Sequence, residues 1–281
     1  MMARGGIERG PVRERWRWPV ARAWWHTLGL RASSADVGPY RVHWVEAGDP
    51  AAETLVLIHG LSGSSRWWQR NIPALAARYR VVVPDLIGFG RSRCPGPLPA
   101  MPDVASVFAK WMDAAGTGPV HLVGHSMGGH LAVHVAARHP ERICRLVLAD
   151  AAGLPRPVTI SSVVRFVYEL APPKQWGDPA FLPVIWGDAL SAGPLAVAQG
   201  LRNILRDDVR PLLPVLTQPT LVIWGAGDAV IPVENAHVFR ATIPGARLAV
   251  IPHAFHNPMV DQPDAFNRLV LDFLAGEQVG E

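Results

Sequence analysis

The sequence of 281 residues predicts an α/β fold: a mainly parallel central sheet, flanked by helices on both faces, with an inserted helical cap. Short apolar runs of strand type alternate along the chain with segments whose apolar residues recur at helical spacing. The hydrophobic fraction is 49% and the charged fraction 18%, which excludes a disordered chain. The alternation breaks once, in the second half of the chain, and that break predicts the cap.

The expected strands are short apolar runs, and several of them end at glycine, proline or aspartate. The first run alternates polar and apolar residues, which is typical of a half-buried strand. The later runs are continuously apolar, as expected for parallel strands covered on both faces. In chain order the predicted strands are Tyr40–Ala47, Thr54–Ile58, Arg80–Val83, Val120–Val123, Arg145–Ala149, Thr220–Trp224 and Arg247–Ile251.

The expected helices place apolar residues three or four positions apart. One example has Val104, Val107, Phe108 and Trp111 on a single face. We expect Pro73 to disturb the first of these helices, because proline lacks the backbone N–H that a helix interior needs. The predicted helices are Arg66–Arg78, Asp103–Ala115, Met127–Arg138, Val233–Thr242 and Pro263–Leu274.

The break in the alternation lies between Gly153 and Pro214. This stretch holds nine prolines and large apolar residues such as Trp176, Phe181 and Trp186. It is too long for a structureless loop inside a compact domain. We therefore expect a mostly helical cap, or lid, over residues 153–212, inserted into a core formed by 37–152 and 213–281.

The formal net charge of +4 is concentrated at the start of the chain. Residues 1–36 hold seven arginines and three acidic residues, whereas the remaining residues carry 20 basic and 20 acidic side chains. The same segment holds four of the eleven tryptophans. Because the body is neutral, we expect no nucleic-acid partner. A basic, tryptophan-rich extension of this kind packs on its own domain, or contacts a membrane surface or a partner protein.

Cysteine usage and hydropathy predict the compartment. The two cysteines, Cys94 and Cys144, offer neither a disulfide framework nor a zinc pattern. No continuous run of about 18 apolar residues predicts a spanning helix, and the start does not have a signal-peptide pattern. We expect a cytoplasmic protein, with peripheral membrane association through residues 1–36 as an alternative. The sequence predicts no particular oligomeric state.

The strongest chemical signal is Gly124–Gly128, which reads G-H-S-M-G between an expected strand and an expected helix. This is the context of a nucleophile elbow, a strand-to-helix turn so sharp that glycine is needed on either side of the nucleophile. The hydroxyl of Ser126 then projects above the sheet at a helix N-terminus, whose dipole favours negative charge. Ser126 is therefore the predicted nucleophile.

A serine nucleophile needs a base, and the base needs an orienting acid. In a parallel sheet these groups come from loops at the carboxyl ends of strands. Asp228 follows one expected strand and His256 follows the next, which predicts a triad of Ser126, Asp228 and His256. From the residues alone, His253 is an alternative base and Asp150 an alternative acid.

Several motifs in order make the chain resemble the α/β-hydrolase fold superfamily over about residues 40–275. His59–Leu61 (H-G-L) is similar to the oxyanion-loop motif, and Asp85–Ser92 (D-L-I-G-F-G-R-S) to the loop after the next strand. Gly225–Asp228 (G-A-G-D) resembles the acid loop. His256–Pro263 (H-N-P-M-V-D-Q-P) resembles the histidine motif, with aspartate in place of the usual glutamate.

The resemblance implies roles for further residues. It favours His256 over His253, because His256 carries the downstream proline-acid-proline spacing. It also implies that the backbone N–H groups of Leu61 and Met127 form the oxyanion hole. We expect no cofactor and no metal. His130 and His134 lie four residues apart on one helix, but no third metal ligand is identifiable in the sequence.

The resemblance implies a serine hydrolase that cleaves a carboxylic ester, like a carboxylesterase or lipase, through an acyl-enzyme. The substrate class is a small-molecule ester or acyl compound. The alternatives with the same triad are a C–C bond hydrolase, a lactonase or thioesterase, and an acyltransferase. A non-catalytic binding protein on this fold is the alternative from another class, but such proteins often lose a triad residue.

Overall fold

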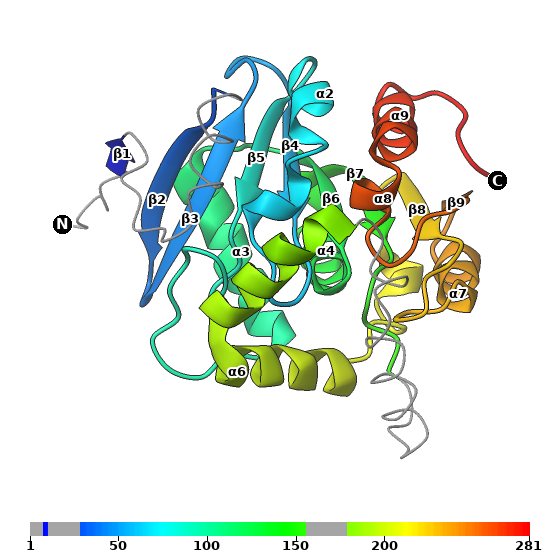
Figure 1. Cartoon of the computed structure of the whole chain (residues 1–281). Helices are drawn as coiled ribbons and strands as arrows, with labels where there is room; N and C mark the ends of the chain where they lie inside the picture. Colours follow the sequence, from blue (N-terminus) through cyan, green and yellow to red (C-terminus); the bar gives the residue numbers. More distant parts are fainter. Residues whose placement is uncertain (1–7, 11–28, 156–178) are drawn as a thin grey trace.

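The computed structural model describes residues 8–10, 29–155 and 179–281, and within them a nine-stranded sheet runs through the molecule (Figure 1). The spatial order of the strands is β1-β2-β3-β5-β4-β6-β7-β8-β9. Their bounds are β1 Glu8–Gly10, β2 Arg31–Val37, β3 Tyr40–Ala47, β4 Thr54–Ile58, β5 Arg80–Pro84, β6 Val120–His125, β7 Ile143–Ala149, β8 Thr220–Gly225 and β9 Arg247–Ile251.

Six neighbouring strands are parallel to one another: β5, β4, β6, β7, β8 and β9. Strands β1, β2 and β3 add an antiparallel edge. Every residue of β4 and of β6 is buried. This burial confirms the interpretation of their continuous apolar runs as strands covered on both faces. Because the strands are parallel, the loops that follow β4, β6, β8 and β9 meet at one edge of the sheet.

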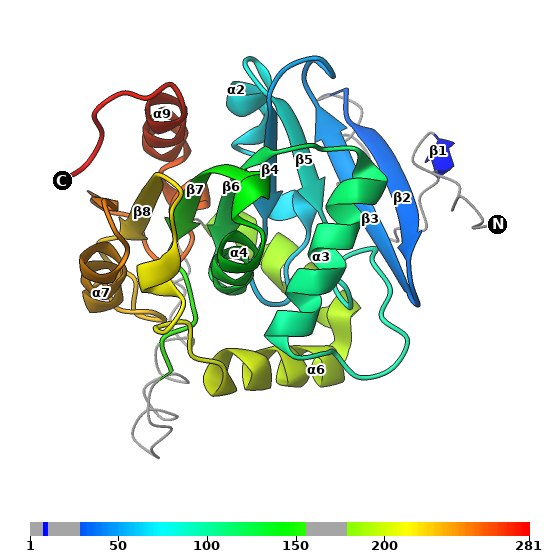
Figure 2. The same cartoon turned by 180° about the vertical axis from the view of Figure 1, so that it is seen from behind.

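Helices cover both faces of the sheet (Figures 1 and 2). One hydrophobic core joins the sheet to residues such as Trp111, Leu131 and Phe239, and the other joins it to Trp68 and Phe266. The first face carries α3 (Met101–Ala115), α4 (Met127–Arg138) and α7 (Glu234–Thr242); the second carries η1 (Ser65–Trp68), α2 (Ile72–Ala76), α8 (Pro258–Asp261) and α9 (Pro263–Leu274).

The mainly parallel α/β architecture is confirmed, and two local expectations are corrected. The single helix expected over 66–78 is instead η1 and α2, because Pro73 lies in the first turn of α2, where its missing N–H does no harm. The sheet also begins earlier than expected. Strand β2 at Arg31–Val37 pairs with β3, so part of the predicted extension 1–36 belongs to the sheet.

Most of the predicted extension, residues 1–7 and 11–28, lies outside the described residues, as does 156–178 of the predicted cap. Contact of residues 1–36 with a membrane or a partner therefore stays a prediction. The described part of the predicted cap consists of η4 (Pro179–Phe181) and α6 (Leu182–Arg206), followed by η5 (Leu213–Val215).

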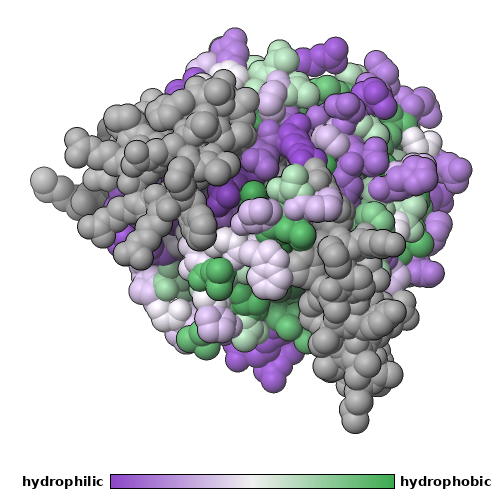
Figure 3. All heavy atoms as spheres, in the orientation of Figure 1, coloured by the Kyte–Doolittle hydropathy of each residue, from purple (hydrophilic) through white to green (hydrophobic). Residues whose placement is uncertain are grey.

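Helix α6 has two limbs that meet at Gly193, where the backbone leaves helical geometry (φ 79°, ψ 159°) ahead of Pro194 (Figure 1). Trp186, Leu190 and Leu195 are exposed on it, and Figure 3 shows hydrophobic side chains among polar ones on this face. The segment Pro179–Arg206 is long and apolar enough to cross a membrane, and an 18-residue stretch within it has a mean hydropathy of 1.4.

That finding differs from the expectation that no segment could span a membrane. The sequence criterion required an unbroken apolar run, whereas Asp188 and Gln199 interrupt α6 without making its average polar. Length and composition alone are weak evidence for a span. The contacts that α6 makes with the loops at the carboxyl edge of the sheet, described below, place it over the candidate site.

Candidate active site

Ser126 lies on the turn between β6 and α4, in a conformation that side chains rarely adopt (φ 52°, ψ −117°). The turn requires glycine on both sides of Ser126. A Cβ on Gly124 would lie 2.4 Å from the carbonyl oxygen of Gly128, and a Cβ on Gly128 would lie 2.5 Å from that of Ile58. The sequence pattern therefore corresponds to a backbone crossing that a larger residue would prevent.

The structure brings together the three residues predicted to form a triad. The Ser126 hydroxyl lies 3.1 Å from Nε2 of His256, and Nδ1 of His256 lies 2.8 Å from Oδ2 of Asp228. With Asp228 ionised, Nδ1–H of His256 donates to the carboxylate, which leaves Nε2 to accept the serine proton. The other carboxylate oxygen of Asp228 accepts hydrogen bonds from the N–H groups of Val230 and Ile231.

Two buried carboxyl groups, those of Asp228 and Asp150, lie within 4.8 Å of each other and of the His256 imidazole. Burial opposes the ionisation of Asp228, but His256 and the hydrogen bonds outweigh it, so the pKa of Asp228 is lowered. Burial and the neighbouring charge of Asp228 raise the pKa of Asp150. The shift at Asp228 favours the ionised form that pairs with His256, whereas the shift at Asp150 is toward the neutral form. Asp150 also accepts a hydrogen bond from the Gly225 N–H.

The alternative base, His253, lies elsewhere. It is exposed, in a left-handed turn conformation (φ 59°), three residues before the histidine that contacts Ser126. Its position gives it no role in the hydrogen-bonded chain from Asp228 to Ser126.

The predicted oxyanion residues, Leu61 and Met127, lie next to the nucleophile. Met127 is the first residue of α4, so its N–H has no acceptor within the helix. A Cβ on Gly60 would lie 3.1 Å from the Cβ of Ser126, which brings the loop after β4 against the elbow. The side chains of Leu61 and Met127 meet at one point of α6, since a Cβ on Gly200 would lie 2.5 Å from Leu61 Cδ1 and 3.5 Å from Met127 Sδ.

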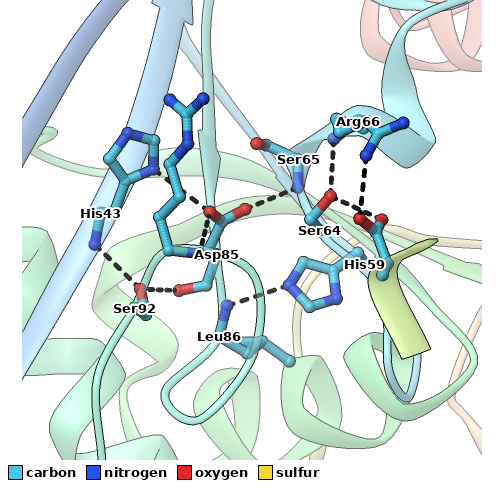
Figure 4. Close-up of polar contacts among 10 residues, drawn as sticks. His43, His59, Ser64, Ser65, Arg66, Asp85, Leu86 and Ser92 are labelled. Atoms are coloured by element: carbon cyan, nitrogen blue, oxygen red, sulfur yellow. Dashed lines mark hydrogen bonds and ion pairs between the residues drawn. The ribbon is translucent and has the colours of Figure 1, made fainter. Parts of the chain in front are cut away.

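Asp85 holds the loops that follow β4 and β5 (Figure 4). One of its carboxylate oxygens accepts the Ser65 N–H at 2.6 Å, and the other lies near the Arg91 N–H and the His43 imidazole. Burial opposes ionisation of this carboxyl, but its hydrogen bonds hold the pKa of Asp85 well below its usual range. Asp85 therefore organises the loops that follow β4 and β5.

His59 connects the same two loops. Its Nε2 accepts the Leu86 N–H at 3.0 Å, and its Nδ1–H donates to the Gly60 carbonyl at 2.8 Å (Figure 4). Burial lowers the pKa of His59, which keeps the imidazole neutral and able to make both bonds.

Sequence reasoning missed the role of His125. This histidine is fully buried beside Ser126, and burial lowers its pKa to about 3. The neutral imidazole donates from Nε2 to the backbone carbonyl of His256 at 2.7 Å. No sequence signal could identify this bond, because the partner is 131 residues away and is a backbone atom.

A second histidine cluster lies on α4, away from the triad. Nε2 of His130 and Nε2 of His134 both contact Oδ2 of Asp207, which is the acidic partner that sequence reasoning did not identify. These three atoms are close enough to hold a metal. However, the guanidinium of Arg138 lies 2.5 Å from Nδ1 of His134. If Nε2 of His134 bound a metal, Nδ1 would carry the hydrogen of the imidazole, and this N–H would face the N–H of Arg138. Two donors cannot bond to each other, so the arrangement fits hydrogen bonding to Asp207 better than metal binding.

Comparison with known proteins gives consistent similarities. Residues 53–179 and 164–263 match the model of the alpha/beta hydrolase fold. The chain is 32% identical over 268 residues to 2-hydroxy-6-oxo-6-phenylhexa-2,4-dienoate hydrolase of Burkholderia cepacia, covering 84% of this chain and 92% of that protein. It is 31% identical over 266 residues to the dihydrolipoyllysine-residue acetyltransferase component of the acetoin cleaving system of Pseudomonas putida. This match covers 88% of this chain and 70% of that protein.

Among solved structures, the crystal structure of a membrane phospholipase A, described as a bacterial virulence factor, resembles this one with a TM-score of 0.79. The two chains are 29% identical, and the superposition covers 92% of this chain and 89% of the other.

Proposed function

Because this chain belongs to the α/β-hydrolase fold family, we propose that it is a serine hydrolase that cleaves carboxylic esters of small molecules through an acyl-enzyme. The observation that carries the proposal is the hydrogen-bonded chain from Asp228 through His256 to Ser126, with donor–acceptor distances of 2.8 Å and 3.1 Å. The likeness to a phospholipase, at 29% identity, supports ester chemistry.

In the acylation step, the Ser126 oxygen attacks the ester carbonyl carbon while its proton moves to Nε2 of His256. The N–H groups of Leu61 and Met127 hold the negative oxygen of the tetrahedral intermediate. The bond to the alcohol oxygen then breaks, and the alcohol leaves with the proton from His256. Asp228 stabilises the imidazolium that exists between these two proton transfers.

In the deacylation step, a water molecule attacks the acyl-enzyme and gives a proton to Nε2 of His256. The bond to the Ser126 oxygen breaks, the serine recovers that proton, and the carboxylic acid leaves. These steps use acid–base and nucleophilic chemistry of the chain's own side chains, so the proposal calls for no cofactor.

A C–C bond hydrolase is the second candidate. The observation that favours it is the 32% identity to the Burkholderia cepacia dienoate hydrolase over most of both chains. An acyltransferase is supported in the same way by the Pseudomonas putida relative. Asn257 and Pro258, which follow His256, differ from the tryptophan that C–C hydrolases of the family tend to carry there, and this favours the ester reaction.

The test is hydrolysis of p-nitrophenyl esters, from acetyl to long-chain acyl, by the wild type and the Ser126→Ala variant. We expect the variant to lose roughly four to six orders of magnitude in kcat and all fluorophosphonate labelling. Ser106→Ala, an exposed serine on α3, is the matched control and should keep both. Full labelling of Ser126→Ala would refute the nucleophile. A labelled but inactive wild type, together with loss of absorbance of a ring-cleavage product, would instead favour C–C hydrolysis.

A further inference from the structure

The cap helix α6 touches the predicted oxyanion loop at two points. In its second limb, Gly200 packs against the side chains of Leu61 and Met127. In its first limb, Asp188 points at the chain just after that loop. Its carboxylate accepts a hydrogen bond of 2.7 Å from the Ser64 hydroxyl and lies 3.3 Å from the Arg66 guanidinium. Asp188 is 1% exposed, which is unusual for a carboxylate in a surface helix.

Residues 64–66 are held from two directions. Asp188 binds the side chains of Ser64 and Arg66. Asp85 accepts the Ser65 N–H at 2.6 Å (Figure 4). The Ser64 oxygen also accepts the Arg66 N–H at 3.3 Å, which caps the first turn of η1. The loop that carries Leu61 therefore ends at an anchor to which the cap contributes a charge.

The loop needs such an anchor because its own geometry is strained. Ser62 has a left-handed backbone (φ 59°), which costs a non-glycine residue about 1 kcal/mol or more. Gly63 packs so tightly that a Cβ would lie 2.8 Å from the Trp67 ring and 3.0 Å from His59. Strain of this kind persists where neighbouring contacts hold the chain in place.

We propose that Asp188 is a positioning residue: by holding Ser64 and Arg66, it fixes the Leu61 N–H in the oxyanion hole and makes the cap helix part of the catalytic arrangement. This inference rests on the proposed function. An oxyanion donor acts in the transition state rather than in substrate binding, so its displacement lowers kcat and leaves KM nearly unchanged.

The anchor responds to pH. The pKa of Asp188 is raised to about 6: burial is the largest cause and the negative charge of Asp85 adds to it, while Arg66 and the Ser64 hydrogen bond oppose the rise. Arg66 from η1 and Asp85 from the loop after β5 are thus the charged groups that act on it. Above pH 6 Asp188 is ionised and pairs with Arg66. Below pH 6 it is protonated, and the pairing weakens.

The experiment compares kcat and KM of the wild type and Asp188→Asn from pH 5 to pH 8, per active site titrated with a fluorophosphonate. Removing an oxyanion donor costs about 10²–10³ in kcat, so we expect a displaced donor to cost about 10-fold at pH 8. KM should stay within about 3-fold. The ratio of the two kcat values cancels any pH effect that both proteins share, and it should approach one below pH 6.

Asp113→Asn is the control, because Asp113, in the last turn of α3, forms an exposed pair with Arg142, and its loss should leave kcat unchanged. An unchanged kcat in Asp188→Asn, or a ratio that is constant across this pH range, would overturn the inference. A structural role alone would lower the number of titrated sites and leave kcat per site at the wild-type value.

The rate of phosphonylation of Ser126 separates this inference from the ester proposal, because it needs the oxyanion hole and no ester substrate. If the wild type is labelled but hydrolyses no ester, the ester proposal fails, and a slower labelling of Asp188→Asn still supports the inference. Equal labelling rates refute it. Should Asp188→Asn not fold, Arg66→Gln serves instead: loss of the positive charge should move the fall in kcat to higher pH, and an unchanged pH profile would contradict the inference.

Discussion

The imidazole of His125 donates a hydrogen bond of 2.7 Å to the backbone carbonyl of His256, so the residue before the predicted nucleophile holds the loop that carries the predicted base. The two rings lie 5.1 Å apart at their centroids. Because His125 is neutral, with a pKa lowered to about 3 by burial, it adds no charge beside His256. The nucleophile and the base are thus fixed relative to each other by a contact outside the triad.

We expect His125→Phe to lower kcat about 10-fold, because the ring still fills the space while the His256 carbonyl loses its donor. Leaving that partly buried carbonyl unsatisfied should also lower the free energy of unfolding by about 1 kcal/mol. His125→Gln is the matched variant: its amide can donate to the same carbonyl and should recover part of the loss. Equal kcat in all three proteins would show that the bond does not position His256.

We expect replacement by asparagine to have different effects at the two neighbouring carboxyls, Asp228 and Asp150. Asp228→Asn should lower kcat about 10⁴-fold, because an amide reverses the tautomer that His256 needs. Asp150→Asn should lower it less than about 10-fold, because Asp150 is not part of the hydrogen-bonded chain from Asp228 to Ser126, and its raised pKa shifts it toward the neutral form that an amide resembles. Ester hydrolysis at pH 8 measures both. A larger loss in Asp150→Asn than in Asp228→Asn would exchange their roles.

Gly200 offers a test of the cap contact that does not involve charge. In Gly200→Ala the new methyl group meets Leu61, Phe89 and Met127, with the closest atom at 2.5 Å. We expect a fall of about 1–3 kcal/mol in the free energy of unfolding and a several-fold loss of kcat/KM, greatest for bulky acyl chains. Gly187→Ala on the same helix meets no atom within 4 Å and should not destabilise the protein. If both variants behave alike, α6 does not pack on the oxyanion residues.

Asp207 predicts a pH dependence of stability. Burial opposes its ionisation, but the bonds from His130 and His134 outweigh this and lower its pKa to about 2, against an ordinary value of 3.8. A carboxyl with a lowered pKa stabilises the folded state above its unfolded pKa, and this contribution disappears as the pH falls through the folded value. The difference in free energy of unfolding between wild type and Asp207→Asn should therefore be full above about pH 5 and shrink between pH 4 and pH 2.

Urea unfolding at pH 7, 5 and 3 checks this expectation. Asp208→Asn is the control, because Asp208 pairs with Arg210 at the surface and such pairs contribute about 0–1 kcal/mol. If the difference in free energy of unfolding between the wild type and Asp207→Asn does not change with pH, the negative charge of Asp207 does not stabilise the end of α6.

Local patterns in the sequence were sufficient for most of the framework. The seven predicted strands and the helices at 127–138 and 263–274 are present, because their apolar spacing is itself the packing pattern of a buried sheet and its covering helices. Strand β2 was missed because Arg31–Val37 carries few large apolar residues, and its identity as a strand depends on pairing with β3.

The chemistry divides in the same way. The residue types and chain order of Ser126, Asp228 and His256 could be predicted from the sequence, because glycine at the elbow and acids or histidines after strands are local requirements. The assignments that depend on distant neighbours required the tertiary structure: the pairing of His125 with the His256 carbonyl, the raised pKa of Asp150, and the burial of Asp188 against Arg66. Spacing along the chain carries no information on burial or on which charges meet, and these two quantities decide hydrogen-bond partners and pKa values.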